Sequence, residues 1–482
     1  MNTDNLSMLC DFYDLTMANG YLASGNGGRV ACFDAFFRSV PDGGGFAIAA
    51  GLKDIIEYIR NLRFDDGDIA YLRGKNIFSV EFLDYLRNFR FTGSIWAVPE
   101  GTPVFPLEPI LTVKAPVMEA HLIETFVLLQ LNHQSLIATK ANRIVRAAQG
   151  RPVMEFGARR AHGADAAVTG ARAAYIGGCA GTSCALTDLK WGIPTMGTMT
   201  HSWVQMFDTE YEAFRTYCGL YPDNPVLLID TYNVMQSGLP NAIRAFKEVL
   251  LPRGLTKCSV RIDSGDISYL SKKVRRILDE EGLFDCRIIA SNSLDEYIIR
   301  DLMMQNARID SFIVGERLVT AASSPMFGCV YKLVAVQNGD GELIPKINLS
   351  ENTGKITTPH FKRVCRFFDK ETGKAVADEV MLADETFDPE EPHKIFDENA
   401  TWKIKVLENY TVEDLLIPVF MDGELVYTSP SEEEIRAYCF DRIDTLWDEI
   451  KRFENPHKYY VDLSEKLWQI KRELIGEKRS LD

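Results

Sequence analysis

The amino-acid sequence predicts an α/β protein built around a parallel sheet that helices cover. In residues 117–339, short apolar segments alternate with helical patterns, and the apolar segments end in small or polar residues. This alternation is typical of successive βα units, in which a helix joins each strand to the next parallel strand. The pattern allows an open or a closed sheet, and the number of strand segments favours a closed barrel.

Strands and helices of this middle region can be located from their apolar patterns. The clear strand segments are residues 153–156, 195–199, 226–229, 258–262, 286–290 and 311–314, with weaker signals at 175–176 and 330–336. An apolar stripe from Ile267 to Leu278 predicts a helix that stops at Gly282. Ser293 and Glu296 have the spacing of a capping box, which predicts the start of the next helix.

The two flanking regions differ from the middle region in their secondary-structure patterns and in their charge. Residues 1–116 mix helical and strand signals and form an N-terminal α+β segment. Residues 340–482 are acidic, with strand signals at 401–407 and 425–427 and a helical pattern over 431–453. We therefore divide the chain into residues 1–116, a catalytic barrel of residues 117–339, and a C-terminal segment of residues 340–482.

Composition and charge exclude several classes of function. The 482 residues are 46% hydrophobic and 25% charged, as in ordinary globular proteins. The net charge of −15 disfavours non-specific binding to nucleic acid or to an anionic membrane. Residues 125–139 are too polar and too short to cross a bilayer and predict a buried helix. The ten scattered cysteines predict reduced core thiols, and the start of the chain lacks the pattern of a secretory leader, so we expect a cytoplasmic protein.

Candidate functional residues lie where the predicted strands end, because that face of a parallel barrel carries the active site. These positions are residues 157–160, 200–202, 230–232, 263–266, 291–293 and 315–317, together with Arg261 inside its strand. Small residues at helix N-termini bind phosphate, aspartates can hold Mg²⁺ on phosphate oxygens, and arginines match carboxylates. The set predicts a site for a phosphorylated, metal-bound substrate and a second, anionic substrate.

Each of these features also has an ordinary structural explanation. Arginine pairs such as Arg159 and Arg160 commonly form surface or dimer salt bridges, and Asp263 and Asp266 are suited to capping the following helix. The glycines at 43–45 fit a flexible turn, and an isolated histidine such as His201 is commonly structural. All of these features except the glycines are placed by the same strand-end rule, and this convergence favours the functional interpretation.

His201 has two candidate roles. The sequence contains no Gly-x-Ser-x-Gly, His-Glu-x-x-His or P-loop motif, and no Gly-x-Gly-x-x-Gly after a strand. Hydrolase, zincin, P-loop and Rossmann dehydrogenase functions are therefore disfavoured. A neutral imidazole is a competent nucleophile toward phosphorus, so His201 is a candidate phosphoryl acceptor or general base.

Spaced blocks of the sequence resemble the nicotinate phosphoribosyltransferase family, in the family's order. They are residues 11–18 (DFYDLTMA), 33–38 (FDAFFR), 43–51 (GGGFAIAAG), 155–161 (EFGARRA), 197–202 (GTMTHS), 261–266 (RIDSGD), 315–320 (GERLVT) and 328–333 (GCVYKL). The resemblance implies conversion of nicotinate and 5-phosphoribosyl 1-pyrophosphate to nicotinate mononucleotide and pyrophosphate, in NAD salvage. It also implies ATP hydrolysis coupled through a phosphohistidine, with Mg²⁺ as cofactor.

The resemblance further implies a fold, an assembly and residue roles. The fold is an irregular α/β barrel of the type II phosphoribosyltransferase kind, with a second α+β domain built from the N- and C-terminal segments. The assembly is a homodimer with shared active sites. His201 would be phosphorylated and Asp263 would contact the ribose or Mg²⁺. Nicotinate would be bound by Tyr13 of the neighbouring subunit, Phe156, Arg159, Thr198 and Arg261, and phosphoribosyl pyrophosphate by Ser291, Asn292, Gly315 and Thr320.

Two positions depart from the family pattern, and two other functions compete with this one. Phe12 stands where the family commonly has Leu, which affects packing only. Glu316 stands where a small Ser or Thr is usual, and a carboxylate there repels phosphate, so the loop that holds the ribose 5-phosphate is left open. The competitors are a nicotinamide phosphoribosyltransferase and a non-catalytic pyridine-nucleotide sensor on the same barrel.

Overall fold

The computed structural model describes residues 5–479, which form two compact units. One unit comprises residues 1–136 and 326–482, and the other comprises residues 137–325. The sequence analysis placed its boundaries at 116/117 and 339/340. The division at 136/137 falls inside helix α6 (Glu124–Ala147), so this helix contributes to both units.

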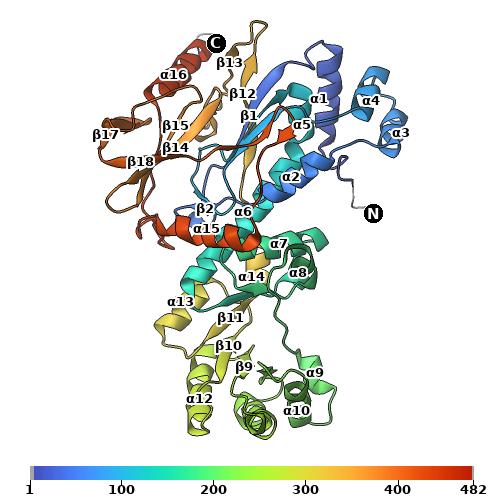
Figure 1. Cartoon of the computed structure of the whole chain (residues 1–482), viewed down its shortest axis with the longest axis vertical. Coiled ribbons are helices and arrows are strands. Elements are labelled where there is room, and N and C mark those ends of the chain that lie inside the picture. The colour runs from blue at the N-terminus through green and yellow to red at the C-terminus, as the bar shows by residue number, and fades with distance from the viewer. Residues whose placement is uncertain (1–4, 480–482) are drawn as a thin grey trace. The chain divides into compact units, whose positions relative to one another are not determined.

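The unit of residues 137–325 is built on a six-stranded parallel sheet (Figure 1). The strand order is β7-β6-β11-β10-β9-β8. The bounds are β6 Val153–Glu155, β7 Gly181–Thr182, β8 Val226–Leu228, β9 Ser259–Ile262, β10 Arg287–Ala290 and β11 Ser311–Val314. Of the six clear predicted strands of this region, all except residues 195–199 are present, within one or two residues of the predicted bounds.

Residues 195–199 do not form the predicted strand. Thr195 makes one isolated bridge to Thr182, and the next contact to a strand is made by a side chain, since the Thr198 hydroxyl donates to the Val226 carbonyl (3.2 Å). Gly197 lies between Thr195 and Thr198, and a glycine inside a strand weakens its regular pattern of hydrogen bonds to the neighbouring strand. Within residues 5–479 the paired strands therefore form a half-barrel, and no hydrogen-bonded strand closes it.

The two weak strand signals were misassigned for different reasons. Tyr175 and Ile176 are the last residues of helix α7 (Ala164–Ile176), where their apolar side chains are buried. Residues 330–336 do form a strand, β12 (Val330–Gln337), but it lies in the other unit, antiparallel to β1 (Val30–Phe36). It therefore adds nothing to the parallel sheet.

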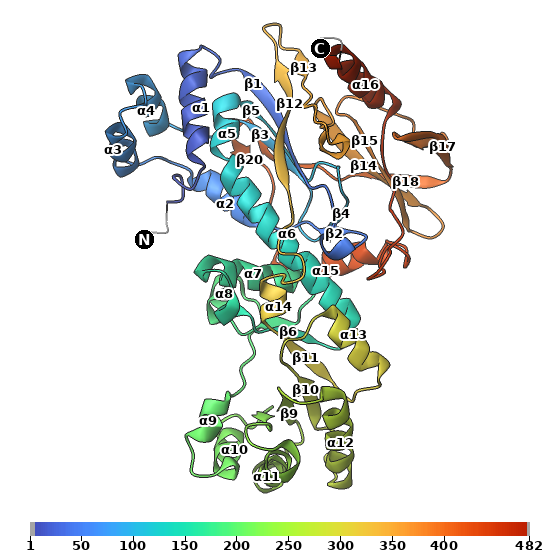
Figure 2. The same ribbon diagram turned by 180° about the vertical axis from the view of Figure 1, so that it is seen from behind.

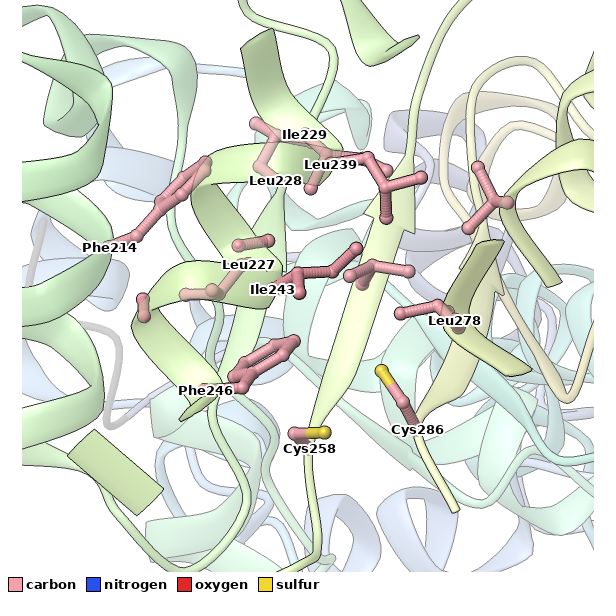
Figure 3. Packing of buried hydrophobic residues seen from close by; sticks show 14 of the residues in the cluster. Phe214, Leu227, Leu228, Ile229, Leu239, Ile243, Phe246, Cys258, Leu278 and Cys286 are labelled. Carbon is pink, nitrogen blue, oxygen red and sulfur yellow. The ribbon is translucent and has the colours of Figure 1, made fainter. Parts of the chain in front are cut away.

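Apolar residues cover both faces of the half-barrel. On the outer face, Leu227 and Val260 of the strands meet Phe214, Ile243 and Leu278 from the surrounding helices (Figure 3). On the inner face, a smaller cluster joins Met154, Val226, Ile289 and Ile313, with Phe156 and Met196 against it. Neighbouring strand residues thus point to opposite faces, and the two clusters fix the register of the sheet.

Two helices of this unit start at aspartate caps that follow strand ends by a few residues. Asp266 caps α12 (Ile267–Glu280), as its position predicts, by accepting from Tyr269 N–H. The next helix, α13 (Glu296–Met304), is capped by Asp295, and the capping box predicted at Ser293 is not formed. The other helices are α8 Ala185–Trp191, α9 His201–Gln205, α10 Glu210–Leu220, α11 Leu239–Ala245 and α14 Glu316–Val319.

The unit that carries both chain ends is built on mainly antiparallel sheets (Figures 1 and 2). A seven-stranded sheet has the order β13-β12-β1-β5-β3-β19-β20, and a four-stranded sheet has the order β18-β14-β15-β21. Strands of the first sheet are β3 Ser94–Ala97, β5 Leu111–Pro116, β13 Leu343–Pro345, β19 Ile417–Met421 and β20 Glu424–Leu425. Strands of the second are β14 Lys362–Asp369, β15 Ala375–Leu382, β18 Tyr410–Asp414 and β21 Val461–Leu463. Segments from both ends of the chain thus share one sheet.

Two short strand pairs and several helices complete this unit. Strand β2 (Ala47–Ile48) pairs with β4 (Pro103–Val104), and β16 (His393–Asp397) pairs with β17 (Ala400–Leu407). Ser431 caps α15 through a capping box, and this helix ends at Asp444, short of the predicted 453. The helices are α1 Phe12–Ala23, α2 Leu52–Asn61, α3 Asp66–Gly74, α4 Val80–Arg87, α5 Val117–Leu122, α15 Glu432–Asp444 and α16 Glu465–Arg479. Among the described residues, no helix combines the length and apolarity needed to cross a bilayer.

Candidate active site

A cleft of about 860 Å³ lies at the carboxyl ends of the parallel strands. The loops after β6, β9, β10 and β11 line it, together with residues 196–202. Of the predicted site residues, the lining includes Phe156, Arg159, Thr198, His201, Arg261, Asp263, Ser291, Asn292 and Gly315. The strand-end rule therefore brings most of the predicted residues into one cavity.

Arg261, Asp263 and Ser291 form a hydrogen-bonded triangle on one side of the cleft. Arg261 donates from Nε to the Ser291 hydroxyl (2.8 Å) and from Nη2 to Oδ1 of Asp263 (2.7 Å). The Ser291 hydroxyl in turn donates to the same Asp263 oxygen. Ser291 is buried, whereas Arg261 and Asp263 are partly exposed to the cleft. The triangle fixes a cation and a carboxylate side by side at the cleft wall.

Asp230 supports the loop that carries Asp263. Its Oδ2 accepts from the Asp263 N–H (3.2 Å) and from the Ser264 hydroxyl (2.5 Å). Its Oδ1 is buried and has no hydrogen-bond partner among the described residues. Asp230 was among the candidate strand-end positions, residues 230–232, but the sequence analysis assigned it no role in the site. Its free oxygen, beside Asp263, marks it as a second carboxylate of the site.

His201 is held by a hydroxyl group of the next strand end. It is the first residue of α9, and its Nδ1 lies 3.1 Å from Oγ1 of Thr231. When Nδ1 carries the proton and donates to Thr231, Nε2 keeps its lone pair. Thr231 was likewise among the candidate strand-end positions, residues 230–232, and was assigned no role in the site. The pair gives the imidazole a fixed orientation at the cleft.

Phe156 and Arg159 line the cleft beyond the end of β6. The Phe156 N–H donates to the Val314 carbonyl (2.7 Å), and the ring is half-buried against the inner apolar cluster. Arg159 lies in the short 3₁₀ turn Ala158–Arg160 and is exposed. Arg159 makes no ion pair within the described part of the chain. An aromatic face and an uncommitted cation therefore occur three residues apart.

A buried carboxylate fixes the backbone that joins Phe156 to Arg159. The Glu155 side chain accepts from the Gly157 N–H and from the Thr182 hydroxyl (2.7 Å). Burial raises the pKa of Glu155, and these two hydrogen bonds oppose the rise. A Cβ at position 157 would stand 2.7 Å from the Val319 Cβ, so this close approach requires glycine.

The loops after β10 and β11 form the remaining wall of the cleft. Asn292 (φ 88°) and Ser293 (φ 47°) both have left-handed backbone conformations, a strain that is concentrated at functional sites. Gly315 and Glu316 also line the cleft. Thr320 lies outside the lining, and its hydroxyl donates to the Glu316 carbonyl (2.7 Å). The structure therefore places a carboxylate, and not the Thr320 hydroxyl, at this wall.

Tyr13 belongs to the other unit. It lies in the first turn of α1, its side chain is 54% exposed, and its hydroxyl donates to Oδ2 of Asp11 (2.8 Å). The ring is thus free to contact a molecule outside its own chain.

Comparisons with known proteins match almost the whole chain. Family models described as the nicotinate phosphoribosyltransferase N-terminal and C-terminal domains match residues 8–132 and 361–471. A nicotinate phosphoribosyltransferase of Bacillus subtilis is 42% identical over 477 residues, which cover 99% of this chain and 96% of the relative. One of Mycobacterium tuberculosis is 40% identical over 463 residues, covering 96% and 92%.

Two solved structures are similar to the fold. The crystal structure of human nicotinic acid phosphoribosyltransferase has a TM-score of 0.84 and 28% identity, covering 97% of this chain and 100% of that chain. A nicotinate-nucleotide pyrophosphorylase from Pyrococcus furiosus has a TM-score of 0.69 and 24% identity, covering 92% and 97%. The second likeness bears on the fold alone.

Proposed function

The chain belongs to the nicotinate phosphoribosyltransferase family, and we propose that its cleft joins nicotinate to 5-phosphoribosyl 1-pyrophosphate. The products are nicotinate mononucleotide and pyrophosphate, which places the enzyme in NAD salvage. The observation that carries the proposal is the convergence of Phe156, from the end of β6, with Arg261 and Asp263, from the end of β9, on one cleft. We infer that the half-barrel is the irregular barrel of type II phosphoribosyltransferases, with residues 195–199 spanning its gap.

Recognition of nicotinate is assigned to an aromatic ring and two arginines. Phe156 offers a face for the pyridine ring, a contact worth about 0.5–1.5 kcal/mol beyond burial of area. Arg159 makes no ion pair within residues 5–479. Arg261 donates hydrogen bonds from Nε and Nη2 to the other members of the triangle, so its Nη1 group is left for a ligand. A neutral nicotinamide would leave such a cation unpaired, so these arginines favour the carboxylate.

Mg²⁺ and the phosphoribosyl group are assigned to the acidic side of the cleft. Asp263 uses Oδ1 in the triangle, and its Oδ2 makes no hydrogen bond within residues 5–479. The buried, unpartnered Oδ1 of Asp230 is a second hard oxygen ligand nearby. These two oxygens fit Mg²⁺, which would neutralise charge on the pyrophosphate. The loops at Asn292 and Gly315 are the proposed contacts for the phosphates.

ATP is the proposed energy source, with His201 as the phosphoryl acceptor. The Nε2 lone pair would form a bond to the γ-phosphorus of ATP while the bond to the departing ADP oxygen breaks. Hydrolysis of the phosphohistidine would return the imidazole and release phosphate. Support comes from the hydrogen bond between Nδ1 and Thr231, which orients the imidazole and is compatible with the tautomer that this attack needs.

The proposed assembly is a homodimer in which Tyr13 reaches the site of the neighbouring subunit. Its exposed ring at the start of α1 supports this role, because a tyrosine ring stacks well on a pyridine. We place the enzyme in the cytoplasm, where its ten free cysteines would stay reduced.

A product assay tests the reaction and separates it from its competitors. The chain is incubated with labelled nicotinate, phosphoribosyl pyrophosphate and Mg²⁺, with and without ATP, and the series is repeated with nicotinamide. We expect mononucleotide from nicotinate, a faster rate with ATP, and ADP release that matches product. Product from nicotinamide alone would assign the sister reaction, and tight binding of a base without product would assign a sensor.

The role of His201 is tested in the same assay by substitution. His201→Asn should lower the ATP-stimulated rate to the rate without ATP and abolish the acid-labile phosphate label from ATP. His162→Asn is the matched control, because His162 is exposed and does not line the cleft. Equal stimulation of His201→Asn and the control would remove the phosphohistidine from the mechanism.

A further inference from the structure

A histidine and two carboxylates from three helices meet in the unit that carries both chain ends. Asp14 lies in the first turn of α1, His121 lies in α5, and Glu124 begins α6. Nδ1 of His121 is 3.3 Å from Oε2 of Glu124 and 3.9 Å from Oδ1 of Asp14. One ligand atom from each residue lies within 4.8 Å of the others. This spacing matches the separation of ligands around one metal ion.

The three residues carry negative charge that no protein cation balances. Asp14 is fully buried, and its Oδ1 has no hydrogen-bond partner among the described residues. Neither Asp14 nor Glu124 pairs with a lysine or arginine in residues 5–479, and their only basic neighbour is His121. Burial and the Glu124 carboxylate raise the pKa of Asp14 to about 6. Buried carboxylates of this kind are stabilised by a bound cation or by a proton.

The surrounding residues hold the ligand atoms in place. The Thr125 hydroxyl donates to Oδ2 of Asp14 (3.1 Å) and accepts from the Asp11 N–H (2.9 Å). The oxygen of Asp14 that faces His121 is therefore the one left free. Nε2 of His121 lies 3.5 Å from the Tyr21 hydroxyl, and the imidazole stacks on the Tyr21 ring. Metal-binding residues are typically oriented by such outer contacts.

We propose that Asp14, His121 and Glu124 bind a divalent transition-metal ion of the zinc class. One imidazole nitrogen and two carboxylate oxygens suit zinc and its neighbours, with water as a fourth ligand. The Glu124 side chain is 18% exposed, which gives the ion and its water a path from solvent. The site is separate from the cleft residues and does not depend on the proposed function.

The ion would join the first turn of α1, the last turn of α5 and the first turn of α6. Helix α1 is otherwise tied to α6 through the Thr125 hydroxyl, and Asp14 follows Tyr13 directly. A metal at Asp14 would therefore fix the turn that presents Tyr13. We assign the ion a structural role, because none of its three ligands lines the cleft of the proposed reaction.

Metal content of the untagged chain tests the site without an activity readout. The chain is loaded with excess zinc, dialysed, and analysed for zinc per chain, with and without competition from cobalt. We expect one equivalent of zinc in the wild type and cobalt d–d absorption on substitution. His121→Asn and Glu124→Gln should each lose the bound ion. His457→Asn is the matched control, because His457 is exposed and makes no ion pair with a carboxylate among the described residues, and it should retain the ion.

A second variant keeps the test decisive if a ligand substitution impairs folding. Thr125→Val removes only the hydroxyl that orients Asp14, and it should weaken zinc binding by about tenfold. Far-UV circular dichroism of the metal-free variants checks that each is folded. Retention of zinc by folded Glu124→Gln at the wild-type level, or no zinc in the wild type, would overturn the proposal and leave the cluster as a protonated triad.

Discussion

The guanidinium of Arg261 and the carboxylate of Asp263 lie side by side, with Nη2 2.7 Å from Oδ1, although only one residue separates them along the chain. The pair spans the end of β9 and the loop that follows. Ser291, at the end of β10, bonds to both members. Since Nε and Nη2 are both held, the direction of Nη1 is fixed before a ligand binds, and such preorganisation lowers the cost of binding an anion.

Ser291→Ala should therefore weaken nicotinate binding. The substitution removes the acceptor of the Arg261 Nε bond and one donor to Asp263. A hydrogen bond to a charged group contributes about 1.5 kcal/mol or more, so KM for nicotinate should rise by roughly tenfold. Steady-state kinetics with each substrate varied measures the effect. Ser293→Ala is the control, because that exposed hydroxyl bonds only to Asn292. A larger rise in KM for phosphoribosyl pyrophosphate would reassign the triangle to that substrate.

Thr231→Val should reduce ATP stimulation without removing His201. The substitution is nearly isosteric and deletes the hydroxyl that lies 3.1 Å from Nδ1. The imidazole then loses its preferred orientation and tautomer, and we expect the ATP-dependent rate to fall by about tenfold. Phosphohistidine formation after mixing with labelled ATP is the direct measurement. Thr231→Ser restores the hydroxyl and should restore the rate; a slow Thr231→Ser variant would point to packing as the cause.

The sequence located the site better than it located the sheet around it. Asp263, Ser291 and Gly315 each follow a short apolar strand, so a local pattern was enough to place them. Residues 195–199 have the same local pattern, yet Thr198 contacts its neighbour through a side chain. The partner of β12 is β1, about 300 residues earlier in the chain, and no local periodicity encodes so distant a pairing.

Residues brought together only by tertiary structure were also beyond the sequence analysis. Asp14 and Thr125 are separated by 111 residues, and their hydrogen bond depends on the packing of α1 against α5 and α6. Asp230 and Thr231 were within reach of the strand-end rule. The rule named them as candidate positions, but no role was assigned to them, because the family blocks on which the residue roles were based do not include them.

Glu316→Ser should improve binding of phosphoribosyl pyrophosphate. Glu316 lines the cleft at the start of α14, where its carboxylate opposes the charge of a phosphate. We expect KM for phosphoribosyl pyrophosphate to fall several-fold and KM for nicotinate to change little. Glu316→Gln removes the charge at constant size and should give most of the effect. An unchanged KM in both variants would place the phosphates on the other side of the cleft, at Asn292.

Asp462→Asn should stabilise the chain at neutral and alkaline pH. Burial raises the pKa of Asp462 to about 7, and the carboxylates of Asp397 and Glu379 add to the rise. When the pKa of a carboxyl group is higher in the folded than in the unfolded protein, the free energy of unfolding decreases as the pH rises from the unfolded pKa to the folded pKa. The wild type should thus lose stability from about pH 4 to pH 7, and the variant should lose roughly 1–2 kcal/mol less over that range. Urea unfolding at pH 5 and pH 8 measures this change in the free energy of unfolding. Asp384→Asn is the control, because Asp384 is exposed.

Mixed dimers should show whether Tyr13 serves a neighbouring subunit. Tyr13→Ala and Arg261→Ala are each expected to have little activity alone. In a mixed dimer, one site combines Tyr13 of one chain with Arg261 of the other and is intact. Random pairing should restore about a quarter of the wild-type rate, because half the dimers are mixed and each keeps one good site. Phe156→Ala mixed with Arg261→Ala is the matched control and should give no recovery, because both residues line the same cleft of one chain. Equal absence of recovery in both mixtures would place Tyr13 in the site of its own chain.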